Sequence, residues 1–152
     1  MGADRDFMLE AVSEARAGLA EGEVPIGAVA VRDGRVIARG HNRRIALSDI
    51  TAHAEMVCLR DLSGRSGLEF DLSGVTVYST LEPCAMCAAA MAFARVERLV
   101  FAADDPKGGA VLHGPKFFEQ PTCHWRPEVA RVDGTIAERS SQVLKAFFRA
   151  RR

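Results

Sequence analysis

Two cysteines and a histidine stand at spacings that allow them to bind one metal ion. Cys84 and Cys87 are three residues apart, directly after Pro83, in a stretch that predicts a helix. Side chains at positions i and i+3 of a helix point to one side, and the helix N-terminus favours the thiolate form that binds metal. His53, at the start of another predicted helix, supplies a third ligand. We therefore expect one zinc ion on His53, Cys84 and Cys87.

The number of ligands indicates the kind of zinc site. Three protein ligands leave one position of a tetrahedral zinc open, which is typical of catalytic sites. A water molecule there is acidified to a pKa of roughly 7 and becomes a nucleophile at neutral pH. Glu55 is two residues from His53 and does not share its face of the helix. Glu55 is therefore better placed to stand beside the water and shuttle protons than to bind the metal.

Each half of this pattern is weak evidence by itself. A C-x-x-C pair also occurs in structural zinc sites, in redox motifs and among buried core cysteines. Cys123 or His124 could complete a structural site as a fourth ligand. A redox pair is disfavoured because thioredoxin-type motifs follow a strand in a different local context. The two halves together, each opening a predicted helix, favour a catalytic zinc site.

The composition is that of an ordinary globular protein. Of the 152 residues, 48% are hydrophobic and 26% charged, and this length favours a single domain over residues 1–152. Twenty basic side chains balance twenty acidic ones, so any nucleic acid must meet a local basic patch. No apolar stretch approaches the roughly 18 residues of a membrane span, and no secretory signal is recognisable. We expect a cytoplasmic protein without a membrane span.

The spacing of apolar residues predicts the elements that position these side chains. Helices are expected over residues 6–20, 51–59, 84–94 and 137–152, with Thr51 as the cap of the second and Pro83 in the first turn of the third. Strands are expected over residues 26–31, 36–38, 75–80, 98–103 and 128–132. The Asp33–Gly34 turn favours an antiparallel hairpin of the first two strands. Residues 104–127 are expected to be mostly loop, with a short helix near Phe117. This order indicates an α/β fold with a mixed sheet and helices on its faces.

Segments along nearly the whole chain resemble one family. H-x-E followed by P-C-x-x-C is the signature of zinc nucleobase deaminases, and the flanking segments are similar to the bacterial tRNA-specific adenosine deaminases. The similar segments are residues 23–29, 40–43, 51–56, 81–87, 105–110 and 147–152. The resemblance implies a cytidine deaminase-like fold, a three-layer α/β/α sandwich with a mixed five-stranded sheet.

The resemblance also implies an activity and a set of site residues. The activity is hydrolytic deamination of adenosine to inosine at the anticodon wobble position of tRNA, using zinc-activated water. One zinc per subunit is implied on His53, Cys84 and Cys87, with Glu55 as the proton shuttle, in a homodimer that binds the tRNA anticodon stem-loop. The implied substrate-binding residues are Asn42 at the nucleoside, Val24, Pro25 and Ile26 around the base, Asp105 and Lys107 along the RNA, and Phe148 and Arg149 beside the anticodon loop.

Other functions stay open at this point. The same zinc site would serve a deaminase of a free nucleobase or nucleoside, such as cytosine or guanine. A non-enzymatic zinc-stabilised module is a third candidate, but such a module has no need of Glu55. The basic residues near the C-terminus fit either phosphate binding or a solvated helix end, and one of Phe147 and Phe148 is expected to pack inward. Two positions differ from the family pattern: Ile50 stands where proline is usual, and Asp104 where a basic residue is common.

Overall fold

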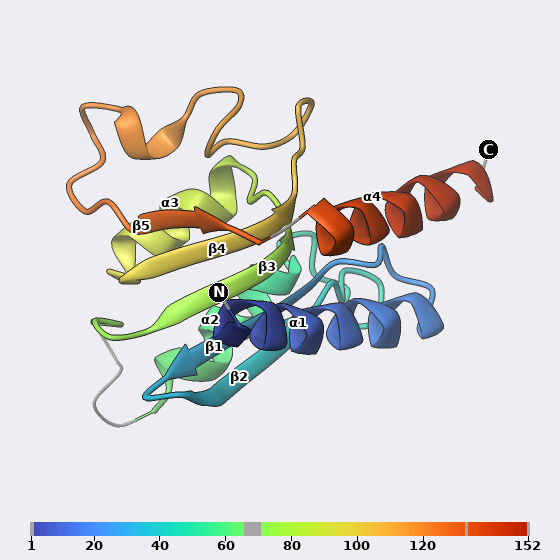
Figure 1. Cartoon of the computed structure of the whole chain (residues 1–152), viewed down its shortest axis with the longest axis horizontal. Helices are drawn as coiled ribbons and strands as arrows, with labels where there is room; N and C mark the ends of the chain where they lie inside the picture. The colour runs from blue at the N-terminus through green and yellow to red at the C-terminus, as the bar shows by residue number, and fades with distance from the viewer. Residues whose placement is uncertain (1, 66–70, 133, 152) are drawn as a thin grey trace.

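A five-stranded mixed sheet forms the middle layer of the protein. The computed structural model describes residues 2–65, 71–132 and 134–151 (Figure 1). The strands are β1 (Gly27–Arg32), β2 (Arg35–His41), β3 (Thr76–Leu81), β4 (Arg98–Ala103) and β5 (Glu128–Arg131), in the order β2-β1-β3-β4-β5. β1 is antiparallel to β2 and β3, whereas β3, β4 and β5 are parallel. The start of β1 and the ends of β2, β3 and β4 therefore meet at one end of the sheet.

Helices cover both faces of this sheet (Figure 1). α1 (Gly2–Ala20) and α4 (Gly134–Arg149) pack on one face, and α2 (Ala54–Ser63) and α3 (Ala85–Phe93) pack on the other. The C-terminal part of α4 extends beyond the sheet. None of the helices in the described part of the chain is long and apolar enough to cross a membrane. The arrangement confirms the expected three-layer α/β/α sandwich with a mixed five-stranded sheet.

The alternation of side chains along each strand supplies two cores. Successive side chains of a strand point to opposite faces of the sheet. Val29 and Val31 of β1 belong to the core beneath α1 and α4, whereas Ala28 and Ala30 belong to the core beneath α2 and α3. Strands that are buried on both faces are what a sheet covered by helices on both sides requires.

The predicted elements are confirmed, with differences at their ends. β4 has the predicted bounds, and the turn at Asp33 and Gly34, both at positive φ, joins β1 and β2 as an antiparallel hairpin. α1 begins at Gly2 instead of residue 6, and α2 ends at Ser63 instead of residue 59. α4 begins at Gly134, and Arg152, the last residue of the predicted terminal helix, lies outside the described residues.

The prediction that Thr51 caps α2 is wrong. The Thr51 hydroxyl donates to Asp49 Oδ1 at 2.7 Å. The N-cap position belongs to His53, whose side chain makes no capping hydrogen bond. The backbone N–H of Ala54 instead donates to Asn42 Oδ1 at 2.8 Å. The cap is therefore provided from the end of β2 and not by a residue adjacent in sequence.

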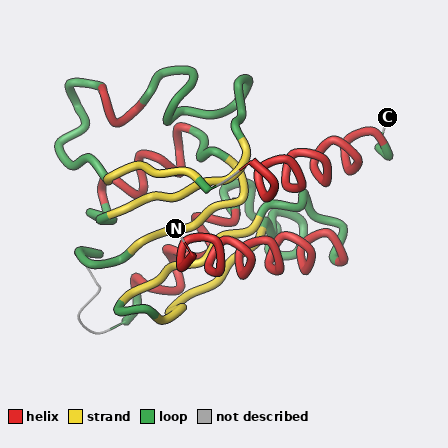
Figure 2. Tube along the Cα trace, in the orientation of Figure 1, coloured by secondary structure: helices red, strands yellow, loops and turns green. Residues whose placement is uncertain are grey.

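The segment between β4 and β5 is almost entirely loop, as predicted (Figure 2). A short 3-10 helix, η1 (Phe117–Glu119), interrupts it near the expected position. Val111, Phe118 and Cys123 of this segment are buried and join the core beneath α2 and α3. The segment is therefore packed against the body of the protein.

Candidate metal centre and substrate groove

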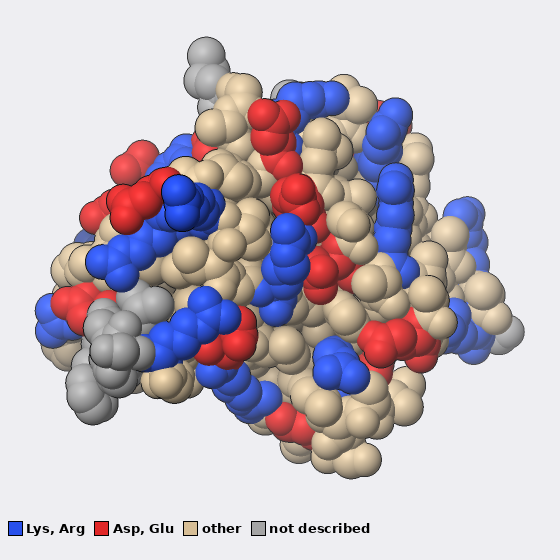
Figure 3. All heavy atoms as spheres, turned by 90° about the horizontal axis from the view of Figure 1, so that it is seen from below, with Lys and Arg blue, Asp and Glu red and all other residues tan. Residues whose placement is uncertain are grey.

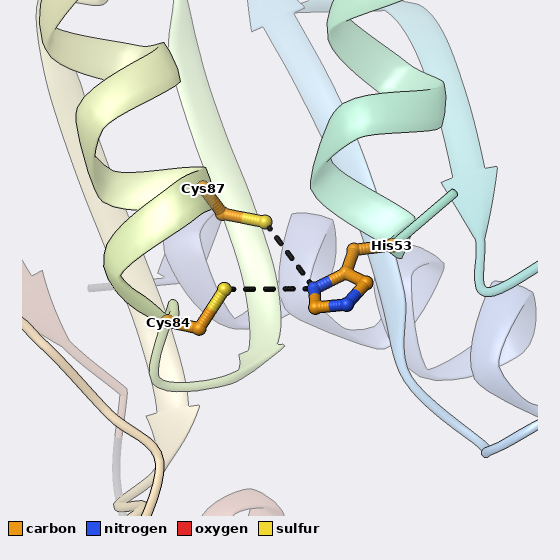
Figure 4. Close-up of side chains that lie close together, drawn as sticks. All are labelled: His53, Cys84 and Cys87. Carbon is orange, nitrogen blue, oxygen red and sulfur yellow. Dashed lines mark hydrogen bonds between the residues drawn. The ribbon is translucent and has the colours of Figure 1, made fainter. Parts of the chain in front are cut away.

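His53, Cys84 and Cys87 converge where α2 and α3 begin (Figure 4). Cys84 is the N-cap residue of α3 and Cys87 lies in its first turn, so Pro83 precedes the helix and is not in its first turn as predicted. The Nδ1 atom of His53 is 3.5 Å from the Cys84 Sγ atom and 3.6 Å from the Cys87 Sγ atom. The three donor atoms all lie within 4.8 Å of one another. The sheet thus brings two helix N-termini together. The start of α2 contributes His53, and the start of α3 contributes Cys84 and Cys87.

This set of donors fits zinc. Zn²⁺ prefers thiolate and imidazole ligands at about 2.0–2.3 Å, so donor atoms that are 3.5 Å apart can surround a single ion. Within residues 2–65, 71–132 and 134–151, no other group of three such side chains is positioned to hold a metal. The Cys123 thiol donates to the Trp125 carbonyl oxygen at 3.1 Å, so it is engaged elsewhere. The three-ligand arrangement is the one that suits a catalytic zinc site.

Hydrogen bonds within this group adjust the thiol pKa values. The bond from the Cys87 thiol, with a further contribution from His53, lowers the pKa of Cys84 to about 4. The bond to Cys84 raises the pKa of His53. The same pairing, together with burial, raises the pKa of Cys87. The Cys84 thiol therefore loses its proton more readily than an ordinary cysteine, and a metal ion that binds displaces the remaining thiol proton.

Glu55 lies beside the metal ligands without being one of them. It is in the first turn of α2, and only 4% of the residue is exposed. Burial raises the pKa of its carboxyl to about 7. The charge of Cys84 raises this pKa further, whereas the charge of His53 and a hydrogen bond with Cys87 lower it. A carboxyl group with a pKa near 7 can take up and release protons at neutral pH.

A large open groove, of about 1330 Å³, begins at the same end of the sheet. Leu81 and Ala103, the last residues of β3 and β4, lie in its wall. Six residues that the family resemblance assigns to substrate binding line it: Val24, Ile26, Asp105, Lys107, Phe148 and Arg149. The loop after β4 and the exposed end of α4 thus face the same space as the start of β1.

The two other expected substrate residues lie elsewhere. Pro25 borders a separate cavity of about 60 Å³ that is lined mainly by residues of α1 and α4. Asn42 is buried directly after β2, where its Oδ1 atom caps α2. Of the two adjacent phenylalanines on α4, Phe147 is buried and Phe148 is 50% exposed, as expected for such a pair.

Both signs of charge occur in the groove. Its charged lining residues are Asp104, Asp105, Lys107, Arg131, Glu138, Lys145, Arg149 and Arg151. Asp104, which differs from the family pattern, pairs with Arg131 at 2.8 Å, and the Arg131 guanidinium lies 4.8 Å from the centre of the Phe101 ring. On the face of the molecule seen from below in Figure 3, basic and acidic side chains are likewise interspersed.

Two buried glutamates that the sequence analysis does not single out support this end of the molecule. Glu23, just before the start of β1, accepts hydrogen bonds from the backbone N–H groups of Ile45 and Ala46. Glu82, directly after β3, accepts hydrogen bonds from the loop after β4. Burial alone would raise the pKa of Glu82, but these bonds hold it below its ordinary value. Because burying an unpaired carboxylate is costly, these backbone donors are what allow the two side chains to be buried.

Comparison with known proteins identifies relatives over nearly the whole chain. Residues 1–103 match the family model of the cytidine and deoxycytidylate deaminase zinc-binding region. The tRNA-specific adenosine deaminase of Agrobacterium fabrum (strain C58) is 52% identical over 146 residues, which cover 96% of this chain and 94% of that protein. The tRNA-specific adenosine deaminase of Bacillus subtilis (strain 168) is 42% identical over 146 residues, 96% of this chain and 89% of that protein.

Two solved structures are also similar to this chain. A structure from "Biochemical and Structural Studies of A-to-I Editing by tRNA:A34 Deaminases at the Wobble Position of Transfer RNA" is 51% identical, with a TM-score of 0.86 over 92% of this chain and 99% of that chain. A structure of an NE0047 mutant in complex with 8-azaguanine is 22% identical, with a TM-score of 0.78 over 95% of this chain and 83% of that one. At that identity the second similarity shows the fold alone.

Proposed function

The chain belongs to the tRNA-specific adenosine deaminase family, and from this premise we propose that it converts adenosine to inosine at the wobble position of the tRNA anticodon. The observation that carries the proposal is the convergence of His53, Cys84 and Cys87 with a buried carboxyl group, Glu55, beside them. We further propose that residues 1–152 form one zinc-dependent deaminase domain.

The chemistry follows from the roles that these side chains can take. His53, Cys84 and Cys87 hold one zinc per subunit, which when bound supplies Lewis-acid activation of a water molecule at neutral pH. Glu55, with a pKa of about 7, accepts protons from the attacking water on its carboxylate and delivers them to N1 of the adenine and to the leaving amino group. Water and adenosine thereby become ammonia and inosine.

The target base needs a pocket at the end of the sheet. Val24 and Ile26 offer apolar side chains to the groove, and we propose that they contact the flipped base, with Pro25 fixing the backbone between them. Asn42 uses its Oδ1 atom to cap α2, so its amide NH₂ group is the part that we assign to the nucleoside. This arrangement would place the nucleoside near the residues that bind the metal.

The flanking nucleotides need contacts along the groove. We propose that Asp105, Lys107 and Arg149 contact the RNA backbone and that Phe148 stacks on a base of the anticodon loop. The half-exposed ring of Phe148 and the charged lining of the groove support this assignment. We also propose, from the family resemblance, a homodimer that binds the anticodon stem-loop and a cytoplasmic location, where tRNA is found.

Product analysis tests the proposed function directly. The zinc-loaded protein is incubated with an anticodon stem-loop that has adenosine at the wobble position and, separately, with free adenosine, cytosine and guanine. We expect inosine only in the stem-loop and only at the wobble position. Glu55→Ala serves as the inactive control on the same substrates. Rapid turnover of a free base, with none on the stem-loop, would instead indicate a deaminase of small molecules.

A further inference from the structure

We propose that Glu82 is a positioning residue for RNA binding, because its carboxylate holds the β4 loop (residues 104–113) in the shape that presents Asp105 and Lys107 to the groove. The proposal rests on the proposed function, since it assigns Glu82 a part in binding the same RNA. Glu82 is neither one of the residues that line the groove nor a member of the group of side chains placed to hold the metal.

The Glu82 carboxylate lies at the centre of the β4 loop. Its side chain is fully buried. Its Oε1 atom accepts a hydrogen bond from the Asp105 N–H at 3.1 Å and lies 2.7 Å from the His113 Nδ1 atom. Its Oε2 atom accepts bonds from the N–H groups of Val111, Leu112 and His113, at 2.9–3.1 Å. One side chain thus joins the beginning of the loop to its end.

The loop is also closed around this side chain by its own backbone. The Gly109 N–H donates to the Asp105 carbonyl oxygen at 2.8 Å, and the Gly108 N–H donates to Asp105 Oδ1 at 2.9 Å. A Cβ atom on Gly109 would lie 2.5 Å from the Glu82 Cδ atom and 2.6 Å from the Asp105 carbonyl oxygen. Glycine at position 109 is therefore required by the close approach of the Glu82 carboxylate.

Only a carboxylate satisfies all the donors that surround it. Both oxygen atoms of a carboxylate are acceptors, and here each faces at least one backbone N–H group. A glutamine has one acceptor and one donor group at the same positions. Its NH₂ group would face either the Asp105 N–H or the three N–H groups of residues 111–113, and buried donors without an acceptor are costly. Glu82→Gln therefore loosens the loop while it preserves the size of the side chain.

The first experiment separates RNA binding from catalysis. We expect Glu82→Gln to retain one zinc per chain and a kcat close to that of the unchanged protein at saturating stem-loop. We expect its KM for the stem-loop to rise about tenfold, the loss that follows from unsatisfied buried donors. Glu119→Gln removes the same charge from an exposed position in the segment between β4 and β5 and should change neither constant.

A second variant perturbs the same contact from the side of the loop. Gly109→Ala forces its methyl group against Glu82 and should reproduce the rise in KM without loss of zinc. Gly64→Ala is the matched control, because nothing lies within 4 Å of a Cβ atom at that position. Amide hydrogen exchange of Val111, Leu112 and His113 should become faster in both Glu82→Gln and Gly109→Ala. This measurement reports the loop directly, without reference to activity.

The outcomes distinguish the two proposals. An unchanged KM together with unchanged exchange at residues 111–113 would overturn the role of Glu82 and leave the proposed function standing. A fall in kcat together with loss of zinc would show that Glu82 supports the metal centre, since only Pro83 separates it from Cys84. That result would also overturn the role of Glu82 in RNA binding. If the unchanged protein neither binds nor deaminates the stem-loop, the proposed function fails first and the role of Glu82 in RNA binding fails with it.

Discussion

The side chain of Asn42 caps the helix that carries Glu55. Its Oδ1 atom accepts the Ala54 N–H at 2.8 Å, twelve residues along the chain. The contact joins the end of β2 to the first turn of α2. His53 lies immediately before Ala54, and Glu55 immediately after it. A single hydrogen bond therefore connects Asn42, which we assign to the nucleoside, to the backbone between His53 and Glu55, which we assign to metal binding and proton transfer.

This contact predicts different results for two substitutions of Asn42. Asn42→Ala removes the cap and should lower the free energy of unfolding by about 1 kcal/mol. Asn42→Asp keeps an oxygen acceptor at the helix N-terminus and should retain most of the stability, but it loses the amide NH₂ group that we assign to the nucleoside. Urea unfolding and stem-loop KM measure the two effects. Equal loss of stability in the two variants would contradict the capping role.

Metal content tests the ligand assignment. The protein should contain about one zinc per chain, because His53, Cys84 and Cys87 come from the same chain. A double variant, Cys84→Ala with Cys87→Ala, should lose this zinc, since one imidazole does not hold the ion alone. Cys58→Ala is a control, because Cys58 is buried in the core and is not part of the group. Stoichiometric zinc in the double variant would exclude these ligands.

The role of Glu55 predicts loss of activity without loss of metal. Glu55→Ala should keep its zinc and its fold, because the carboxyl group is not one of the three ligands. Its rate of deamination should fall by about 10²–10⁴-fold, the typical contribution of a general acid or base, or by more because one residue serves several proton transfers. Single-turnover assays on the zinc-loaded variant measure this loss. Normal turnover would require another proton shuttle.

The buried carboxyl of Glu55 also predicts a pH dependence of stability in the metal-free protein. Burial raises its pKa from 4.5 to about 7. Below about pH 4.5 the group is protonated in both folded and unfolded chains, so it has no effect there. As the pH rises towards 7, the unfolded chain loses this proton first, and the free energy of unfolding falls. Above about pH 7 this fall in the free energy of unfolding is complete and is on the order of 3 kcal/mol.

Glu55→Gln isolates this effect, because glutamine does not titrate. Compared with the unchanged protein, the metal-free variant should gain stability between about pH 4.5 and 7 and keep that advantage at higher pH. Urea unfolding at several pH values measures the difference. If the difference in free energy of unfolding between the two metal-free proteins stays constant from about pH 4.5 to 7, Glu55 is not buried in its protonated form.

The metal centre could be predicted from the sequence because each half of it is local. Cys84 and Cys87 share one helix start, and His53 opens another, so short spacings already define two sides of the site. The bounds of β4 could also be predicted, because the apolar run of residues 99–103 directly follows Arg98 and is short enough for a strand. Local signals of this kind do not depend on how the rest of the chain folds.

The residues that sequence analysis misses have partners far away in the chain. Glu82 bonds to groups 23 to 31 residues further on, and no local spacing indicates such contacts. Thr51 has the residue type of a cap, but Asn42, directly after β2, provides the capping oxygen instead. Pro25 and its neighbours are adjacent in sequence, yet Val24 and Ile26 line the groove while Pro25 borders another cavity.

The last prediction concerns the exposed end of α4. Deletion of residues 148–152 removes three arginines and one aromatic ring, and it should weaken stem-loop binding and lower its dependence on salt. Each phosphate contact to single-stranded RNA contributes about 0.7 to the slope of log K against log salt, so the slope should fall by about 2. Zinc content should stay the same, because all three ligands precede this segment.

A point variant distinguishes loss of an RNA contact from an indirect effect of the deletion on packing. Arg151 lies 3.5 Å from the centre of the Phe147 ring, so the truncation also removes a packing contact of a buried side chain. Arg149→Gln leaves that contact in place and should lower the slope by about 0.7. Arg35→Gln, exposed at the start of β2 and absent from the groove lining, should leave it unchanged. Equal slopes for Arg149→Gln, Arg35→Gln and the unchanged protein would show that α4 does not contact the RNA backbone through Arg149.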